Sequence, residues 1–497
     1  MYGGNTDKVQ PNETSGPKLG RRSLEVRTSS SYTRFIESFR LGLFGVMHIL
    51  NNDSVTSTSF VAFSTFAEVL QLISFCFSPM FQWNESIINV VASVVSSFRL
   101  SFFFKPKLFW VACVGANILV ILTILHAVFV GHSFASGRLK LVWTFWIMRL
   151  LCRLLLGFLL MPITSILLET LDCDTVTHLH NIDPSITCWT GFHMSLSVLS
   201  TFTLSIFIIF VSWTSLMFVN RDAMSACSLA ASTGRVNFIV LWVKFIVDLS
   251  FTVSNNANFL ILVLLLSGAV LVFSFLYYIP FYSHVTNKIM VIGYASYLWT
   301  AVCALIAHII KDTTDNAAFM VLLVPLPLVL FSAKTMVDWR REDLSATSME
   351  HISSQWLLPA KLFPIVSTTT MNDGTFAKLI DSATTKFPRS VCVRLFASMC
   401  YDNSKNGPLA IQMIRECEAL EPSMDHSFVL FRRNRLEDEA ARGGTIAFDA
   451  MSLFKIEHHE KEMERNIHLC HNSIILFWEE LSSKSCSFLN CTAISVS

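Results

Sequence analysis

The densest group of potential metal ligands in the chain is KIEHHEKEMERNIHLCH, Lys455 to His471, with four histidines, a cysteine and four glutamates. Imidazole, thiolate and carboxylate groups all bind transition metals. The apolar residues here recur every three or four positions, which predicts one continuous helical stripe: Ile456, His459, Met463, Ile467, Cys470, Ile474, Phe477 and Leu481. At 3.6 residues per turn, His458 lies well away from His468 and His471. We therefore expect a long packing helix rather than a metal cage.

A smaller metal set remains on a second face of this helix. Glu464, His468 and His471 share that face with Glu457 and Glu460, and they would need a further ligand from another helix. A solvated acidic face explains the same pattern and is the favoured interpretation. The sequence thus predicts no metal and no other cofactor, and a face suited to binding a partner.

The second group of reactive residues lies inside apolar runs: Glu68, Arg149, Arg153, Lys244 and Asp248. Ionisable residues within a membrane are energetically costly and are candidates for function. Lys244 and Asp248 lie four apart and are expected to neutralise each other. Arg149 and Arg153 reach the interface if their span starts only at Leu154. The functional alternative is a buried stripe of cations that meets Glu68 or Asp248 across the bundle and lines a ligand or ion path.

The composition explains why the apolar runs that contain these charges are expected to span a membrane. Of 497 residues, 53% are apolar and only 15% are charged, whereas about a quarter are charged in a soluble protein. A membrane-spanning helix needs about 20 mainly apolar residues. Such runs predict about eight spans within 57–337: 57–79, 108–133, 141–170, 192–219, 236–254, 258–280, 289–310 and 317–337. The run Ser86–Phe104 is either an interfacial helix or a ninth span.

The distribution of lysine and arginine predicts an orientation, because these residues are enriched in cytoplasmic loops. The N-terminal arm, 1–56, is basic, and so is the run Lys334–Arg341. The loops Glu169–Trp189 and Ser254–Asn258 contain neither lysine nor arginine. We therefore expect both termini in the cytoplasm and an even number of spans. The basic residues that contradict this orientation are Arg99, Lys105 and Lys107.

Two features of the loops placed outside are open to modification. Cys173 and Cys188 share one such loop and are candidates for a disulfide. Asn84 begins the sequon Asn84-Glu85-Ser86 and is a candidate for glycosylation.

The remainder of the chain is polar enough to be a soluble tail. A juxtamembrane linker, 338–386, precedes a helical segment, 387–482, and an irregular end, 483–497. RSVCVRLFASMCYD, GPLAIQMIRECEALEP and SMDHSFVLFRRNRLEDEAARGG predict three helices separated by turns. The first two resemble one tetratricopeptide (TPR) unit at Tyr401, Ala410, Ile414 and Pro422, without the Trp, Leu and Gly that usually start it. Such repeats offer a surface to a protein partner or to a second copy.

Known catalytic motifs are missing from the sequence. A phosphate-binding glycine loop, a nucleophile elbow, HExxH and the kinase signatures are all absent, and His458-His459-Glu460 is no zincin helix. The basic residues are scattered, which gives no support for nucleic-acid binding. The expected fold is therefore all-α, a polytopic transmembrane bundle followed by a cytoplasmic helical-repeat segment, and not an enzyme.

The tail carries a resemblance to a known family. PLAIQMIRECEALEPSMDHSFVLFRRNRLEDEAARGG, followed by AFDAMSLFKIEHHEKEMERNIHLCHNSIILFWEEL, resembles the tiny macrocysts family. The resemblance covers 57–481 in layout, while the recognisable sequence lies in the tail, including its FW-x-x-L close at Phe477, Trp478 and Leu481. In flagellate protists, similar regions precede a PAS module and an adenylate or guanylate cyclase domain. The chain ends soon after Leu481, so the resemblance implies no catalytic residue here.

The resemblance implies a membrane sensor with coupling helices, and it alone suggests the plasma membrane. The leading hypothesis is a non-enzymatic signalling protein whose bundle receives an input that the tail passes on. One alternative is a transporter or channel that uses the five intramembrane charges. Another is a truncated fragment of a larger nucleotide cyclase.

Overall fold

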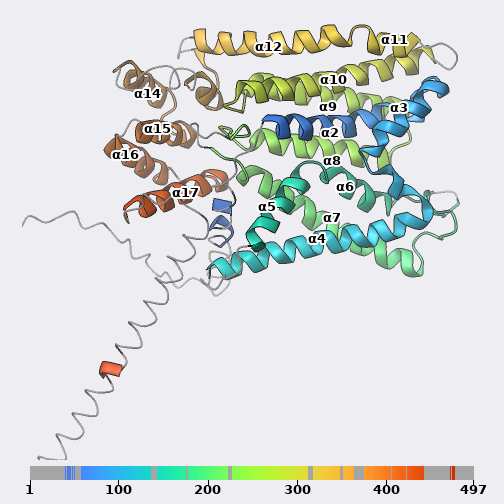
Figure 1. Ribbon diagram of the computed structural model, residues 1–497, viewed down its shortest axis with the longest axis horizontal. Coiled ribbons are helices and arrows are strands. Elements are labelled where there is room, and N and C mark those ends of the chain that lie inside the picture. Colours follow the sequence, from blue (N-terminus) through green and yellow to red (C-terminus); the bar gives the residue numbers. More distant parts are fainter. Residues whose placement is uncertain are drawn as a thin grey trace, which may run out of the picture.

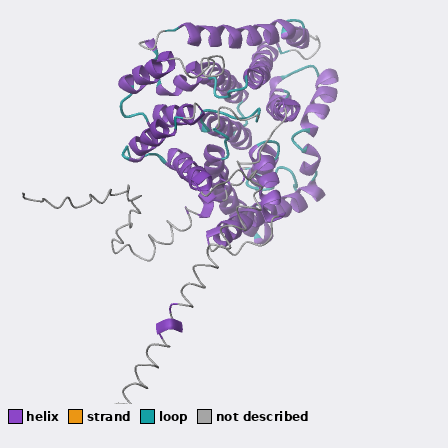
Figure 2. Ribbon diagram, turned by 60° about the vertical axis from the view of Figure 1, so that its left-hand side comes forward, coloured by secondary structure: helices purple, strands orange, loops and turns teal. Residues whose placement is uncertain are grey.

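All regular elements of the structure are helical. The computed structural model describes residues 40, 42–45, 47, 48, 50, 58–135, 143–174, 177–221, 227–311, 317–347, 351–362, 374–403, 406–420, 422–441, 471 and 473–475. Within these ranges there are α-helices, short 3-10 helices and isolated β-bridges, and no strand (Figure 2). The expected all-α fold is confirmed.

The membrane half consists of long apolar helices that lie side by side (Figure 1). Among the described residues, seven stretches are long and apolar enough to cross a membrane, and eight if one bent pair counts as a span. They are α2 (Thr58–Cys76), α4 (Pro106–Ala135), the bent pair α5 (Trp143–Leu156) and α6 (Leu160–Glu169), α7 (Gly191–Met217), α8 (Arg235–Val253), α9 (Ala257–Tyr278), α10 (His284–Ile310), and α11 (Ala317–Leu323) with α12 (Leu326–Ala346). Each lies within a few residues of an expected span, except that α12 continues beyond 337.

The two ends of the bundle differ. The tail end, where α2, α8 and α10 begin, faces the later helices α14 (Gly374–Lys386), α15 (Val391–Asn403), α16 (Gly407–Glu418) and α17 (Met424–Ala441) (Figure 1). The far end holds α3 (Glu85–Ser97) and the 170–190 loop. Because α2 ends and α4 begins at the far end, the intervening run Ser86–Phe104 adds no crossing. The interpretation of this run as a ninth span is therefore wrong.

The third span bends by 67° between α5 and α6. Pro162 has no N–H, so the carbonyl of Phe158 lacks its helical donor. The Gln71 side chain on α2 donates to that carbonyl at 2.8 Å and also to the Phe98 carbonyl at 2.9 Å. Inside a membrane, a backbone carbonyl freed by a helix break needs such a hydrogen-bond donor from a neighbouring helix. At Gly157 a Cβ would lie 3.2 Å from Glu68 Oε1, so glycine permits the close approach of the bend to α2.

The linker packs as part of the tail rather than as a separate spacer. Its buried residues join α15 and the end of α12 in one apolar cluster: Leu344, Ile352, Leu357, Leu358, Leu362, Ile380, Val393 and Phe396. Lys361 is buried, and its ammonium donates to the carbonyls of Leu344, Ser345 and Thr347 at the end of α12. A cation at this place satisfies carbonyls that no helical N–H reaches. The three helices expected from 387 onward correspond to α15, α16 and α17.

Candidate functional site

The first buried charge pair joins α8 to α2. Lys244 is only 1% exposed, and its Nζ lies 2.5 Å from Glu68 Oε2. Ser64, one turn earlier on α2, donates to the other carboxylate oxygen at 3.2 Å. The ammonium and the carboxylate therefore neutralise each other between two helices.

The second buried pair lies closer to the far end. Asp248 is 2% exposed and accepts hydrogen bonds of 2.6 Å from both Thr164 and Ser165 on α6. Arg99, from the turn after α3, reaches the same carboxylate at 3.9 Å and lies over the ring of Phe75 at 3.8 Å. Asp248 therefore ties together three elements that are distant in the sequence.

These contacts replace the expected pairing of Lys244 with Asp248 along one helix. Each side chain bonds a residue on another element, because α2, α6 and the turn after α3 all pack against α8. Arg99 was unexpected as a partner, although its conflict with the charge rule already marked it. Helix α5 begins at Trp143 and contains both Arg149 and Arg153, as the expected span 141–170 does. Their position at the interface stays a prediction.

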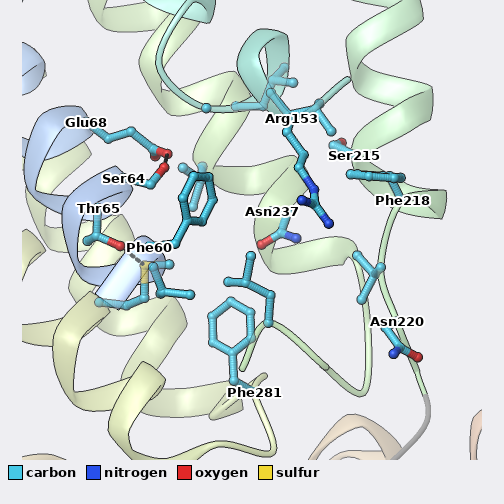
Figure 3. Close-up of a pocket in the computed structure, with 18 of the residues that line it drawn as sticks. Phe60, Ser64, Thr65, Glu68, Arg153, Ser215, Phe218, Asn220, Asn237 and Phe281 are labelled. Carbon is cyan, nitrogen blue, oxygen red and sulfur yellow. Dashed lines mark hydrogen bonds between the residues drawn. The ribbon is translucent and has the colours of Figure 1, made fainter. Parts of the chain in front are cut away.

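Arg153 lines a cavity of about 170 Å³ in the tail half of the bundle. The walls come from α2, α5, α7, α8, α9, α10 and the loops after α7 and α9, and most of the lining residues are apolar. Figure 3 shows the Arg153 guanidinium pointing into the cavity toward the Asn237 amide, with Glu68 on the opposite wall. The cavity thus brings together two of the five predicted intramembrane charges. Arg149 does not line it.

The tail helices dock on the bundle next to this cavity. Asp425 on α17 lies 3.5 Å from Arg221 and 3.8 Å from Arg235, the first residue of α8. The guanidinium of Arg235 also lies 3.8 Å above the ring of Trp356, and His426 stacks on that ring almost in parallel. We call these five residues the junction. No sequence pattern indicated this junction.

The protonation of the junction is biased by burial. Burial lowers the pKa of His426 to about 4, despite the opposing effect of Asp425. Its Nδ1 lies 2.9 Å from the Ser423 hydroxyl, which donates to Asp425 at 2.5 Å. Burial acts to raise the pKa of Asp425, but the positive charge of His426 when it is protonated, this hydroxyl and the two arginines outweigh it, and the pKa is lowered. At neutral pH the junction therefore has a neutral imidazole, an ionised carboxylate and two cations.

Helix α8 connects all of these contacts. It carries Arg235 at the junction, Lys244 behind the cavity and Asp248 near the far end. With a rise of 1.5 Å per residue, the thirteen positions between the first and the last correspond to about 20 Å. A shift of this one helix would move the junction, the cavity wall and the far-end contacts together.

The far end holds the remaining candidates. Cys173 and Cys188 form a disulfide. His193 lies close enough for the three side chains to suggest a metal site, but the bonded sulfurs do not offer thiolates. Asn84 lies at this same end, directly before α3. Of the helical metal candidates, Glu464 and His468 lie outside the described residues, and His471 is exposed.

The fold and the composition define a multi-pass helical membrane protein, with a helical tail docked on one end. The chain is similar to Tiny macrocysts protein B of Dictyostelium discoideum, with 25% identity over 331 residues, 63% of this chain and 23% of that protein. It is similar to Tiny macrocysts protein C of the same organism at 21% identity, with the same shares covered. The resemblance to the tiny macrocysts proteins is thereby confirmed, and the chain spans about a quarter of their length. No family model and no solved structure matches the chain.

Proposed function

We propose that this protein is a non-enzymatic membrane signalling protein in which the cavity receives an input and the docked tail passes it on. The observation that carries the proposal is the position of α8. This helix forms a wall of the cavity through Asn237, Val240 and Leu241, and its first residue holds the tail through Asp425. Because helices are stiff, a change in cavity packing is transmitted to the junction by a movement of α8.

The proposed orientation places the tail in the cytoplasm. The disulfide loop and the Asn84 sequon lie at the far end, opposite the tail helices. Disulfides persist in oxidising compartments outside the cytosol, and the basic loops of the sequence lie at the tail end. Together these features support cytoplasmic termini. The proposed target of the TPR-like α15–α16 pair is a protein, either a partner or a second copy.

Hydrogen–deuterium exchange of the full chain in nanodiscs tests the coupling. Lys244→Met removes the cation behind the cavity, nine residues from the junction, and is expected to raise exchange across residues 424–441. Lys288→Met is the matched control, because Lys288 pairs with the half-exposed Asp338 on α12 and does not line the cavity. If both variants leave the exchange of α17 unchanged, coupling through α8 is refuted.

Transport is a second candidate, favoured by the Arg153 guanidinium inside a cavity of the bundle. In that case flux into proteoliposomes should be abolished by Arg153→Gln while the protein stays folded. A flux that survives neutralisation of all five intramembrane charges rules this candidate out.

A further inference from the structure

The cavity has a polar side that the protein leaves unused. Several hydroxyls in its wall already donate within the protein: Ser64 to Glu68, Thr65 to Met290 and Ser215 to Ser212. Three other polar side chains of the wall, those of Arg153, Asn237 and Tyr294, make no hydrogen bond among the described residues. Arg153 offers only donors and the Asn237 amide offers a donor beside its carbonyl oxygen, and both face the same space (Figure 3). The unused side of the cavity is therefore rich in donors.

The charge of the wall is unbalanced in the same direction. The carboxylate of Glu68 is neutralised by Lys244 at 2.5 Å. The guanidinium of Arg153 has no carboxylate within 4 Å among the described residues, so it leaves the described wall with a net charge of about +1. A half-buried guanidinium in a mainly apolar wall favours a carboxylate, which its planar donors bind in pairs. An occupant with one negative charge neutralises this positive charge. An occupant with two negative charges would leave the site with a net negative charge.

The rest of the wall limits the size and the polarity of the occupant. Phe60, Phe218 and Phe281 face the space (Figure 3). The volume of about 170 Å³ is close to that of a cavity of about 150 Å³ that holds one benzene ring. The occupant is thus about the size of a single ring and apolar apart from its acid group.

We infer that this cavity binds a small monocarboxylate with an aromatic or compact apolar body, its carboxylate on Arg153 and Asn237 and its body among the phenylalanines. The inference names the ligand class of the proposed input site and rests on the proposed function only in that respect. The same chemistry has two sources, a water-soluble acid or a fatty acid that enters from the bilayer. The size of the cavity favours the soluble acid.

Direct binding to the purified full chain in nanodiscs tests this inference. Benzoate is expected to bind saturably, its neutral analogue benzamide at least tenfold more weakly, and benzylamine not at all. Laurate is the probe for an acid that enters from the bilayer. If laurate binds saturably and benzoate does not bind, the assignment of a ring-sized soluble acid is overturned. Equal affinities for benzoate and benzamide overturn the carboxylate itself.

Variants assign the binding to this cavity. Arg153→Gln is expected to weaken benzoate at least tenfold, whereas Arg153→Lys keeps the charge and loses less. Arg149→Gln, four residues earlier and outside the cavity wall, is the matched control and should lose far less affinity than Arg153→Gln. Asn237→Leu removes the second donor and gives an independent test if Arg153→Gln fails to fold. Unchanged affinity in both Arg153→Gln and Asn237→Leu overturns the inference.

Binding and coupling fail separately. If benzoate binds but the exchange of α17 does not change, the ligand class stands and the proposed signalling role is refuted. If no acid binds while Lys244→Met still loosens α17, the coupling stands and the ligand class is refuted.

Discussion

Removing the cation of the buried pair Lys244–Glu68 is expected to destabilise the bundle strongly. At 2.5 Å two unit charges attract by roughly 7 kcal/mol at an effective dielectric of about 20, and most of this offsets the desolvation of both groups. Breaking such a pair typically costs about 3–5 kcal/mol, since one charge is left buried alone. Glu68 keeps the Ser64 hydroxyl and is 15% exposed. We therefore expect about 3 kcal/mol for Lys244→Met.

The assay is the free energy of unfolding in mixed micelles, measured as a double-mutant cycle. Glu68→Gln in the Lys244→Met background removes the stranded charge and should recover about 2 kcal/mol or more. Lys288→Met breaks a pair whose carboxylate is 38% exposed, so it should cost under about 1 kcal/mol. The reasoning is refuted if the two single losses at Lys244 and Glu68 simply add, or if Lys244→Met costs no more than Lys288→Met.

Four further predictions follow from the tail and the far end. Docking lowers the pKa of His426 to about 4, whereas the ordinary pKa of histidine is about 6.5. The neutral imidazole therefore stabilises docking fully above about pH 6.5, and docking should weaken between about pH 6.5 and 4 as protons bind the undocked form. The measurement is the rate of tail proteolysis across this pH range, which should rise as the pH falls and should depend less on pH in His426→Phe. Replacing Cys173 and Cys188, 15 residues apart, by serine should cost about 3 kcal/mol, measured as the free energy of unfolding. Lys361→Met should strand carbonyls at the end of α12 and lower stability by about 1–3 kcal/mol, whereas no loss would contradict its capping role. Asn84→Gln should abolish a glycan-dependent shift in gel mobility, and a shift that persists contradicts modification there.

The spans were predictable because the bilayer imposes a strong and simple constraint on the sequence. About 20 apolar residues are needed for each crossing, so every expected run contains a helix. The bend at Gly157 was not predictable from this pattern. It depends on a proline that frees a carbonyl and on the Gln71 amide that meets it from α2, 87 residues away in sequence.

The charged residues were predictable as candidates but not as pairs. Spacing along one helix suggested that Lys244 meets Asp248, whereas packing gives each a partner on another element. The junction shows the same limit more strongly. Arg221 and Arg235 have the sequence context of ordinary loop cations, and only the docking of α17 brings Asp425 to both. Contacts between distant elements carry no local signal in the chain.

The most direct test of coupling between the cavity and the tail is a distance measurement between spin labels on the bundle and on the tail. Val285→Cys on α10 and Ile411→Cys on α16 are both exposed, and serine at Cys470, Cys486 and Cys491 removes cysteines outside the described residues. Adding benzoate should shift the distance distribution in this protein and leave it unchanged when Arg153→Gln is also present. A distribution that stays the same while benzoate is shown to bind would contradict the account.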